Sequence, residues 1–194
     1  MSKQINIGVG GTNHKAKPYI GVGGVVKKVK AVYAGIGGVV KQLWQSILYL
    51  IDSINTFNCY TCYQKRPTYD KWWASTILSL EAQAYRDYED AITYPGNVTV
   101  CVGEAIDLTS FSKVYVEVTN DSTGTGTIYV SNVPDGDTGY IAGVSCSVYS
   151  NPIYNRVYSF DISNVNGIGY IKVRFTTSDY RGASCFTVHR IWLE

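Results

Sequence analysis

The segment Lys113-Val-Tyr-Val-Glu-Val-Thr119 alternates apolar and polar side chains along its whole length. Because successive side chains of a β-strand point to opposite faces, this pattern places Val114, Val116 and Val118 together on one buried face. The segment Tyr170-Ile-Lys-Val-Arg-Phe-Thr176 repeats the alternation, with its Ile, Val and Phe on the inner face. Both segments therefore predict strands that pack one face on a hydrophobic core.

Other short segments share this strand character and are separated by clusters of turn-forming residues. The further strand candidates are Thr127–Ser131, Gly143–Tyr149, Val157–Ile162 and Cys185–Leu193. The turn clusters are Asn120–Gly124, Pro134–Gly139, Asn164–Gly167 and Asp179–Gly182. Short strands at this spacing, with no helices between them, predict an all-β fold, either an antiparallel β-sandwich or a barrel.

Residues 69–93 fit two patterns. Apolar side chains at the i, i+3 and i+4 spacing of a helix are Trp73, Ile77, Leu80, Ala84 and Tyr88. The stretch Ile77–Tyr85 also alternates loosely, as an opening strand would. We favour strand, because the sandwich needs strands before Val98, but the pattern leaves helix open.

Before residue 46 the chain is organised as a repeat. Ile7–Gly11, Ile20–Lys27 and Ala34–Lys41 align, with their first glycines 13 and then 14 residues apart. The nine glycines of the three units are Gly8, Gly10, Gly11, Gly21, Gly23, Gly24, Gly35, Gly37 and Gly38. Glycine pairs supply the positive φ of tight hairpin turns, so each unit predicts strand, glycine turn, strand. An arm of this size cannot build its own core, so we expect it to pack against copies of itself or against another protein.

Charge divides the chain in the same place. Residues 1–45 carry seven lysines and no acid, whereas the remaining 149 residues carry 10 basic and 15 acidic side chains. A basic arm suits nucleic acid or an acidic protein partner. The arm has no arginine and only two tyrosines before Trp44, and nucleic-acid sites favour arginine and stacked aromatics. We therefore expect docking on a protein and no nucleic-acid partner.

Composition excludes several protein classes. The 194 residues include only 16% charged side chains, far fewer than a disordered chain or a coiled coil needs. The longest dense apolar stretch, Ile47–Ile51, is much shorter than the roughly 20 residues that span a bilayer as a helix. We therefore expect a globular protein with no membrane partner.

The five cysteines are an odd number, which argues against a fully paired disulfide framework. Cys59-Tyr-Thr-Cys62 is a single CxxC, and the only histidines, His14 and His189, are distant from it in the sequence. A zinc site needs about four ligands. We expect reduced structural thiols, with zinc or a redox pair as the alternative that the spacing leaves open.

Nucleotide binding and catalysis find no support in the motifs. The third glycine of a GxGxxG fingerprint is missing in every repeat unit, and no GxxxxGK[ST] is present. His189 lies beside Arg190 in a predicted strand, where histidine is seldom a base. The Asp135-Gly-Asp137 segment could ligate calcium, but it fits an ordinary turn as well. We expect no enzyme activity, no catalytic residue, no cofactor and no metal.

The arm, with its repeated GVGG units, resembles the N-terminal arms of virion proteins from phages and prophages of Gram-positive bacteria. The body resembles the jelly-roll, carbohydrate-binding-like domain often fused to such arms. The stretches that carry the second resemblance are Ala105–Val118, Phe160–Ile171 and His189–Glu194. Residues 52–96 have no part in either resemblance.

The resemblance implies a virion appendage of a tail, baseplate or capsid surface, assembled in the host cytoplasm. Residues 1–45 would anchor it to other virion proteins, and residues 46–194 would form the outward-facing sandwich of a homo-oligomer. A free lectin-like module, with the arm as a linker, is the competing interpretation. A linker is usually irregular or rich in serine and proline, and this arm is neither.

Aromatic side chains near turns are the candidates for contact with a host cell-wall glycan. Sugar sites use exposed rings as platforms with polar groups close by. The candidates, all flanked by turn residues or charges, are Tyr69, Trp72, Trp73, Tyr154 and Tyr180. Burial in the core or in a subunit contact is the alternative for each, and a purely architectural sandwich stays open.

Overall fold

The computed structural model describes residues 5–9, 12–16, 19–22, 25–28, 31–36, 39–45, 48–51, 58–65, 69–148 and 152–194. Side chains are described from Leu48 onward, and before it only the backbone is. The chain divides into two units. Met1–Leu48, with Glu194, forms the first, and Tyr49–Leu193 forms the second.

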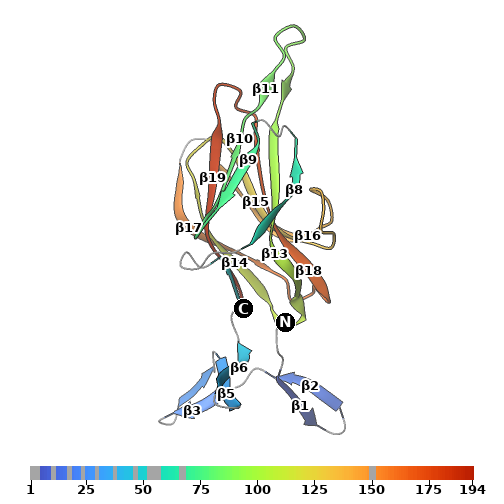
Figure 1. Ribbon diagram of the computed structural model, residues 1–194, viewed down its shortest axis with the longest axis vertical. Coiled ribbons are helices and arrows are strands. Elements are labelled where there is room, and N and C mark those ends of the chain that lie inside the picture. The colour runs from blue at the N-terminus through green and yellow to red at the C-terminus, as the bar shows by residue number, and fades with distance from the viewer. Residues whose placement is uncertain are drawn as a thin grey trace. The chain divides into compact units, whose positions relative to one another are not determined.

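The described residues of the first unit form three antiparallel hairpins (Figure 1). Their strands are β1 (Ile5–Val9) with β2 (Thr12–Ala16), β3 (Tyr19–Val22) with β4 (Val25–Lys28), and β5 (Ala31–Ile36) with β6 (Val39–Gln45). The innermost partners are Val9 and Thr12, Val22 and Val25, and Ile36 and Val39. The predicted hairpin arm is thus confirmed.

The arm glycines fall in two groups. Gly8, Gly21 and Gly35 lie within β1, β3 and β5. In the sequence, a Gly-Gly pair stands between each set of innermost partners. These pairs, which we expect in the turns, lie outside the described residues: Gly10, Gly11, Gly23, Gly24, Gly37 and Gly38.

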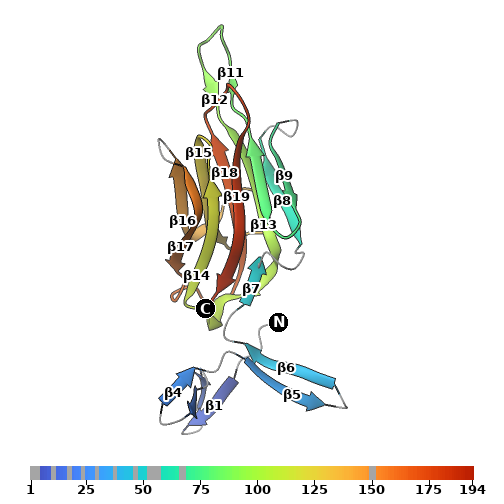
Figure 2. The ribbon, with the colours of Figure 1, turned by 90° about the vertical axis from the view of Figure 1, so that its left-hand side faces the viewer.

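The second unit contains two large antiparallel sheets and one small two-stranded hairpin (Figure 2). The β14 sheet has the order β17 (Ile153–Asp161), β14 (Lys113–Asn120), β19 (Ser184–Leu193), β10 (Leu78–Ala82) and β9 (Lys71–Ala74), and β7 (Leu48–Ile51) also pairs with β19. The β15 sheet has the order β16 (Tyr140–Val148), β15 (Gly124–Ser131), β18 (Ile168–Thr177), β13 (Gly96–Asp107) and β8 (Cys59–Gln64).

The path of the chain between the sheets is that of a jelly roll. From β13 to β19 the chain crosses to the other sheet at every connection except the β15–β16 hairpin. With β10, this path accounts for four neighbouring strands in each sheet, β17-β14-β19-β10 and β16-β15-β18-β13. In the described part of the chain, the one helical element is a 3-10 turn at Leu108–Ser110. The sequence prediction of an all-β antiparallel sandwich is confirmed, and the barrel alternative is not adopted.

The ambiguous segment 69–93 forms strands, as favoured. It contains β9, β10 and the start of the small hairpin of β11 (Tyr85–Arg86) and β12 (Thr93–Tyr94). Trp73 lies on β9, Ile77 lies in the turn between the strands, and Leu80 lies on β10. The i, i+3 and i+4 spacing therefore runs across successive strands and the connections between them, without a helix. No helix in the described residues is long and apolar enough to cross a membrane.

The core lies between the two sheets. The predicted inward valines Val114, Val116 and Val118 are fully buried on the β14 sheet. Phe175 of β18 and Phe186 of β19 stack across the sheets with nearly parallel planes, with ring centroids 5.8 Å apart and planes 7° apart. Close packing of this kind leaves no room for extra atoms.

We expect Gly126→Ala to destabilise the sandwich. A Cβ at Gly126 would lie 2.2 Å from the ring of Phe186, which is fully buried and stacked, so the ring cannot move away cheaply. Overpacking of this kind costs about 1–3 kcal/mol in the free energy of unfolding. Gly182→Ala is the matched control, because a Cβ there meets nothing within 4 Å. Urea unfolding of both variants measures the difference, and equal stability would contradict the packing.

Candidate functional site

The β11–β12 hairpin projects from one end of the sandwich, and β7 lies at the opposite end (Figure 2). Tyr85 and Tyr94 face each other across the hairpin, with ring centroids 6.2 Å apart. The turn is held by Asp87, whose Oδ1 accepts the backbone N–H of Glu89 at 2.9 Å. The hairpin is therefore short but stabilised by its own hydrogen bonds, and it carries exposed tyrosines.

A hollow of about 170 Å³ lies at the base of this hairpin. Its lining is mostly aromatic and consists of Tyr69, Gln83, Ala84, Tyr85, Arg86, Tyr88 and Tyr180. The backbone N–H of Ala84 donates to the carbonyl of Asp179 at 3.0 Å, which joins the β10–β11 connection to the loop between β18 and β19. Segments distant in sequence thus meet in one site, which we call the tyrosine hollow.

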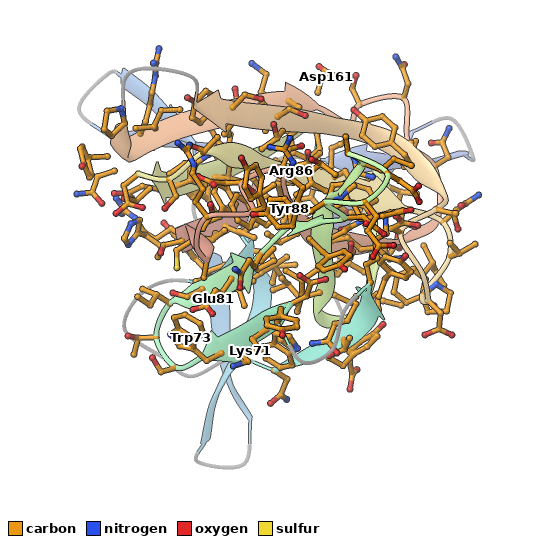
Figure 3. The ribbon with its side chains drawn as sticks, turned by 90° about the horizontal axis from the view of Figure 1, so that it is seen from above. Lys71, Trp73, Glu81, Arg86, Tyr88 and Asp161 are labelled. Atoms are coloured by element: carbon orange, nitrogen blue, oxygen red, sulfur yellow. The ribbon has the colours of Figure 1, made fainter. Side chains whose placement is uncertain are left out.

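Arg86 is held in the tyrosine hollow by two rings. Its Nη1 donates to the phenol oxygen of Tyr180 at 2.8 Å. Its guanidinium carbon lies 5.1 Å from the ring centroid of Tyr180 and 5.6 Å from that of Tyr88, within the range of cation–π attraction. Tyr88 and Tyr180 meet edge to face at 6.5 Å. Figure 3 shows Arg86 and Tyr88 side by side.

The arrangement suits the binding of a small ring with polar substituents. Tyr88 is 77% exposed and Tyr85 is 49% exposed, so aromatic surface is open to solvent. Pockets that enclose a drug-sized ligand measure about 300–1,000 Å³. At about 170 Å³, the tyrosine hollow has room for a smaller group, about one sugar ring. Arg86 and Gln83 add polar groups to its wall.

The structure separates the five aromatic candidates. Tyr69 and Tyr180 line the tyrosine hollow. Trp72 is half-buried and donates from Nε1 to Thr61 Oγ1 at 2.7 Å, so it joins the edge strands β9 and β8. Trp73 is 48% exposed, and Figure 3 shows it near Lys71 and Glu81 of β9 and β10. Tyr154, on β17, is also exposed, but neither Trp73 nor Tyr154 lines the hollow.

Sequence analysis missed Tyr85, Arg86 and Tyr88. A signal was present, because Tyr85-Arg-Asp-Tyr-Glu-Asp-Ala-Ile-Thr-Tyr94 contains three tyrosines and an arginine within ten residues. The segment was considered only as helix or strand. A hairpin that extends beyond the sheets was not considered.

The cysteines are free thiols. Cys62 of β8 lies beside the buried Cys101 of β13, and its Sγ donates to the carbonyl of Pro134 at 3.2 Å. Burial raises the pKa of Cys59 to about 12. The neighbouring Cys62 side chain lowers the pKa of Cys101 to about 7. Within the described residues, no group of three or more His, Cys, Asp or Glu side chains is placed to hold a metal ion.

Backbone carbonyls of the Asp135–Asp137 segment bind the ammonium group of a lysine from the same chain. Lys172 is fully buried, and its Nζ donates to the carbonyl of Asp135 at 3.1 Å and to that of Gly136 at 2.9 Å. The N–H of Gly136 in turn donates to the carbonyl of Cys62 at 3.0 Å. These carbonyls therefore bind an ammonium group and fasten the β15–β16 loop to the outer face of the β15 sheet.

His189 lies on β19, and its Nε2 is 2.8 Å from Thr119 Oγ1 on the neighbouring strand. It is half-buried and is not part of the lining of the tyrosine hollow. The side chain of His14 lies outside the described residues.

No protein-family model matches the chain, and no curated protein matches it. Solved structures do. A xylan binding module, CBM86, from Roseburia intestinalis is 14% identical, with 71% of this chain and 94% of that chain covered and a TM-score of 0.39. A mutant of a family 29 carbohydrate binding module is 9% identical, with 76% and 89% covered and a TM-score of 0.42. The family 32 module of C. perfringens NanJ, in complex with galactose, is 11% identical, with 76% and 98% covered and a TM-score of 0.32. At these scores and identities, the likeness bears on neither the ligand nor the partners of this chain.

We expect Tyr180→Phe to destabilise the sandwich, because it removes the phenol oxygen that accepts from Arg86. The loss of one such hydrogen bond lowers the free energy of unfolding by about 0.5–1.5 kcal/mol. Tyr154→Phe is the control, since Tyr154 is 64% exposed and should change stability by less than about 0.5 kcal/mol. Chemical unfolding compares the two variants, and an unchanged Tyr180→Phe protein would contradict the contact.

Proposed function

We propose that this protein is a structural component of a bacteriophage or phage-tail-like particle that binds a host surface glycan. Residues 1–45 anchor it to other virion proteins, and the sandwich presents the tyrosine hollow outward. The observation that supports glycan binding is the cluster of Tyr69, Tyr85, Tyr88 and Tyr180 around a hollow the size of a sugar ring. Aromatic rings stack on the apolar faces of sugars, while neighbouring polar groups bond to the hydroxyls.

The position of the hollow also favours a display role. Tyr49, with which the second unit begins, stacks on Trp192 near the end of β19. The tyrosine hollow lies by the loop that precedes the first residue of the same strand. Ten strand residues span about 33 Å, so the sandwich begins at one end and presents the hollow at the other.

The arm supports anchoring. Its hairpins are two-stranded, and isolated two-stranded hairpins are at best marginally stable in water. The arm therefore needs a partner surface, and its seven lysines favour an acidic one. Other virion proteins, including copies of this chain, are the partners that we propose.

Binding, rather than hydrolysis, is the activity that the lining favours. Most glycoside hydrolases use a pair of carboxylates across the scissile bond. The described residues that line the tyrosine hollow include one charged side chain, Arg86, and no carboxylate. A lectin-like module that acts without a virion is the alternative, and the arm experiment below separates the two.

We expect Tyr88→Ala to weaken binding to purified host cell walls. Each aromatic platform removed should cost about 1–3 kcal/mol, by analogy with the stacking of bases on aromatic side chains. Tyr154→Ala is the matched control, since Tyr154 is exposed but lies outside the hollow. Sedimentation with cell walls measures the affinity. Equal losses for both variants would reject the hollow as the site, and a wild-type protein that binds no wall would indicate a purely architectural sandwich.

We expect a protein that lacks residues 1–45 to remain folded and to fail to enter particles. The described strands of the arm pair within their own hairpins, and the two large sheets of the sandwich contain none of these strands. Circular dichroism checks the fold, and quantitative blotting of purified particles measures incorporation. Normal incorporation of the truncated protein would refute the anchoring role and favour the free lectin-like module.

A further inference from the structure

Arg86 has no carboxylate partner among the described residues. The ion pairs found there are Arg181 with Asp179 and Arg190 with Glu117. Arg86 donates instead to a neutral phenol, and its Nε is buried without a hydrogen-bond partner. A partly buried guanidinium without a counter-charge is unfavourable, because desolvation is not repaid by an opposite charge.

The nearest acid in sequence is engaged elsewhere. Asp87 Oδ1 accepts hydrogen bonds from the backbone N–H groups of Glu89 and Asp90, at 2.9 and 3.5 Å. Its role is thus to close the hairpin turn. A guanidinium has five N–H donors, and the phenol oxygen of Tyr180 occupies one of them. Arg86 therefore retains both charge and donor capacity in the wall of the hollow.

This inference rests on the proposed function and names the class of ligand. We infer that the tyrosine hollow binds an anionic sugar unit, whose carboxylate or phosphate group pairs with the guanidinium of Arg86. The tyrosine rings hold the sugar ring, and Arg86 selects for its charge. Arginine suits this role because its planar fork matches both carboxylate and phosphate oxygens.

The two rings also prepare the guanidinium for such a ligand. Tyr180 holds it by a hydrogen bond and a cation–π contact, and Tyr88 makes a second cation–π contact at 5.6 Å. A side chain held in this way loses little conformational entropy when the ligand binds. Glu89 and Asp90, both exposed in the turn, oppose an anion. Salt screens exposed charges beyond about 8 Å at physiological ionic strength, so direct contact with Arg86 outweighs them.

The volume limits the ligand to one unit at a time. About 170 Å³ is below the range of pockets that enclose larger ligands. The hollow therefore suits a terminal sugar or a single charged unit of a polymer, with the rest of the chain in solvent.

The experiment compares charged and neutral forms of the same sugar by calorimetry on the full chain. The probes are an oligogalacturonate, its methyl ester, which has the same rings without the charge, and a hexose phosphate, which carries a phosphate group on a sugar ring. The first and third probes distinguish a carboxylate from a phosphate as the anion. The variants are Arg86→Gln, which removes the charge, and Arg181→Gln, which removes an exposed arginine that is outside the hollow.

We expect an acidic probe to bind at least tenfold more tightly than the neutral ester, and this preference to disappear in Arg86→Gln but not in Arg181→Gln. We also expect its affinity to fall as salt rises. If the ester binds as tightly as the acid, the anionic ligand is refuted while glycan binding stands. If no probe and no host wall binds, both proposals fail. Thermal unfolding of each variant shows whether a loss reflects misfolding, and Arg86→Lys, which restores the charge, should then recover part of the preference.

Discussion

The stacked pair of Phe175 and Phe186 is the contact on which the sandwich depends. The rings fill the space between the β18 and β19 strands of opposite sheets, and both sit against glycines that leave room for them. A Cβ at Gly124 would lie 2.6 Å from the Phe175 ring. Because β18 ends at Thr177 and β19 begins at Ser184, this packed pair also fixes the two ends of the loop that carries Tyr180. The order of the tyrosine hollow thus derives from apolar packing in the interior.

Local patterns in the sequence were sufficient to predict most of the fold. The alternation at Lys113–Thr119 and the turn clusters correspond to strands and connections of the structure, since period-two burial is a property of each strand by itself. The candidate site was harder to predict from the sequence. Tyr69 and Tyr180 were named as separate candidates, but Tyr180 meets Arg86 across 94 residues of chain, and strand pairing brings the two together. Trp72 differs from them, because its ring nitrogen donates to Thr61 Oγ1 on a neighbouring edge strand.

Charged groups in the second unit are used in two contrasting ways. Lys172 is buried, yet its ammonium is satisfied by the carbonyls of the β15–β16 loop, and this cation therefore has a structural role. Arg86 is held by rings and by one phenol, which orient it without neutralising it. These roles could not be distinguished from the sequence, because Arg86 follows Tyr85, Lys172 stands between Ile171 and Val173, and both lie in predicted β-structure. The difference arises from which loop covers each side chain.

The long strand β19 has a mechanical consequence. It begins beside the loop that carries Tyr180 and ends at Leu193, close to the ring of Trp192 on which Tyr49 stacks. A sandwich held at Tyr49 and bound at the tyrosine hollow would carry tension along its strands. The hydrogen bonds of an antiparallel ladder lie across the strand direction, so the β14–β19 ladder would be loaded in shear, with many bonds resisting together. The same fold pulled from the side would yield bond by bond.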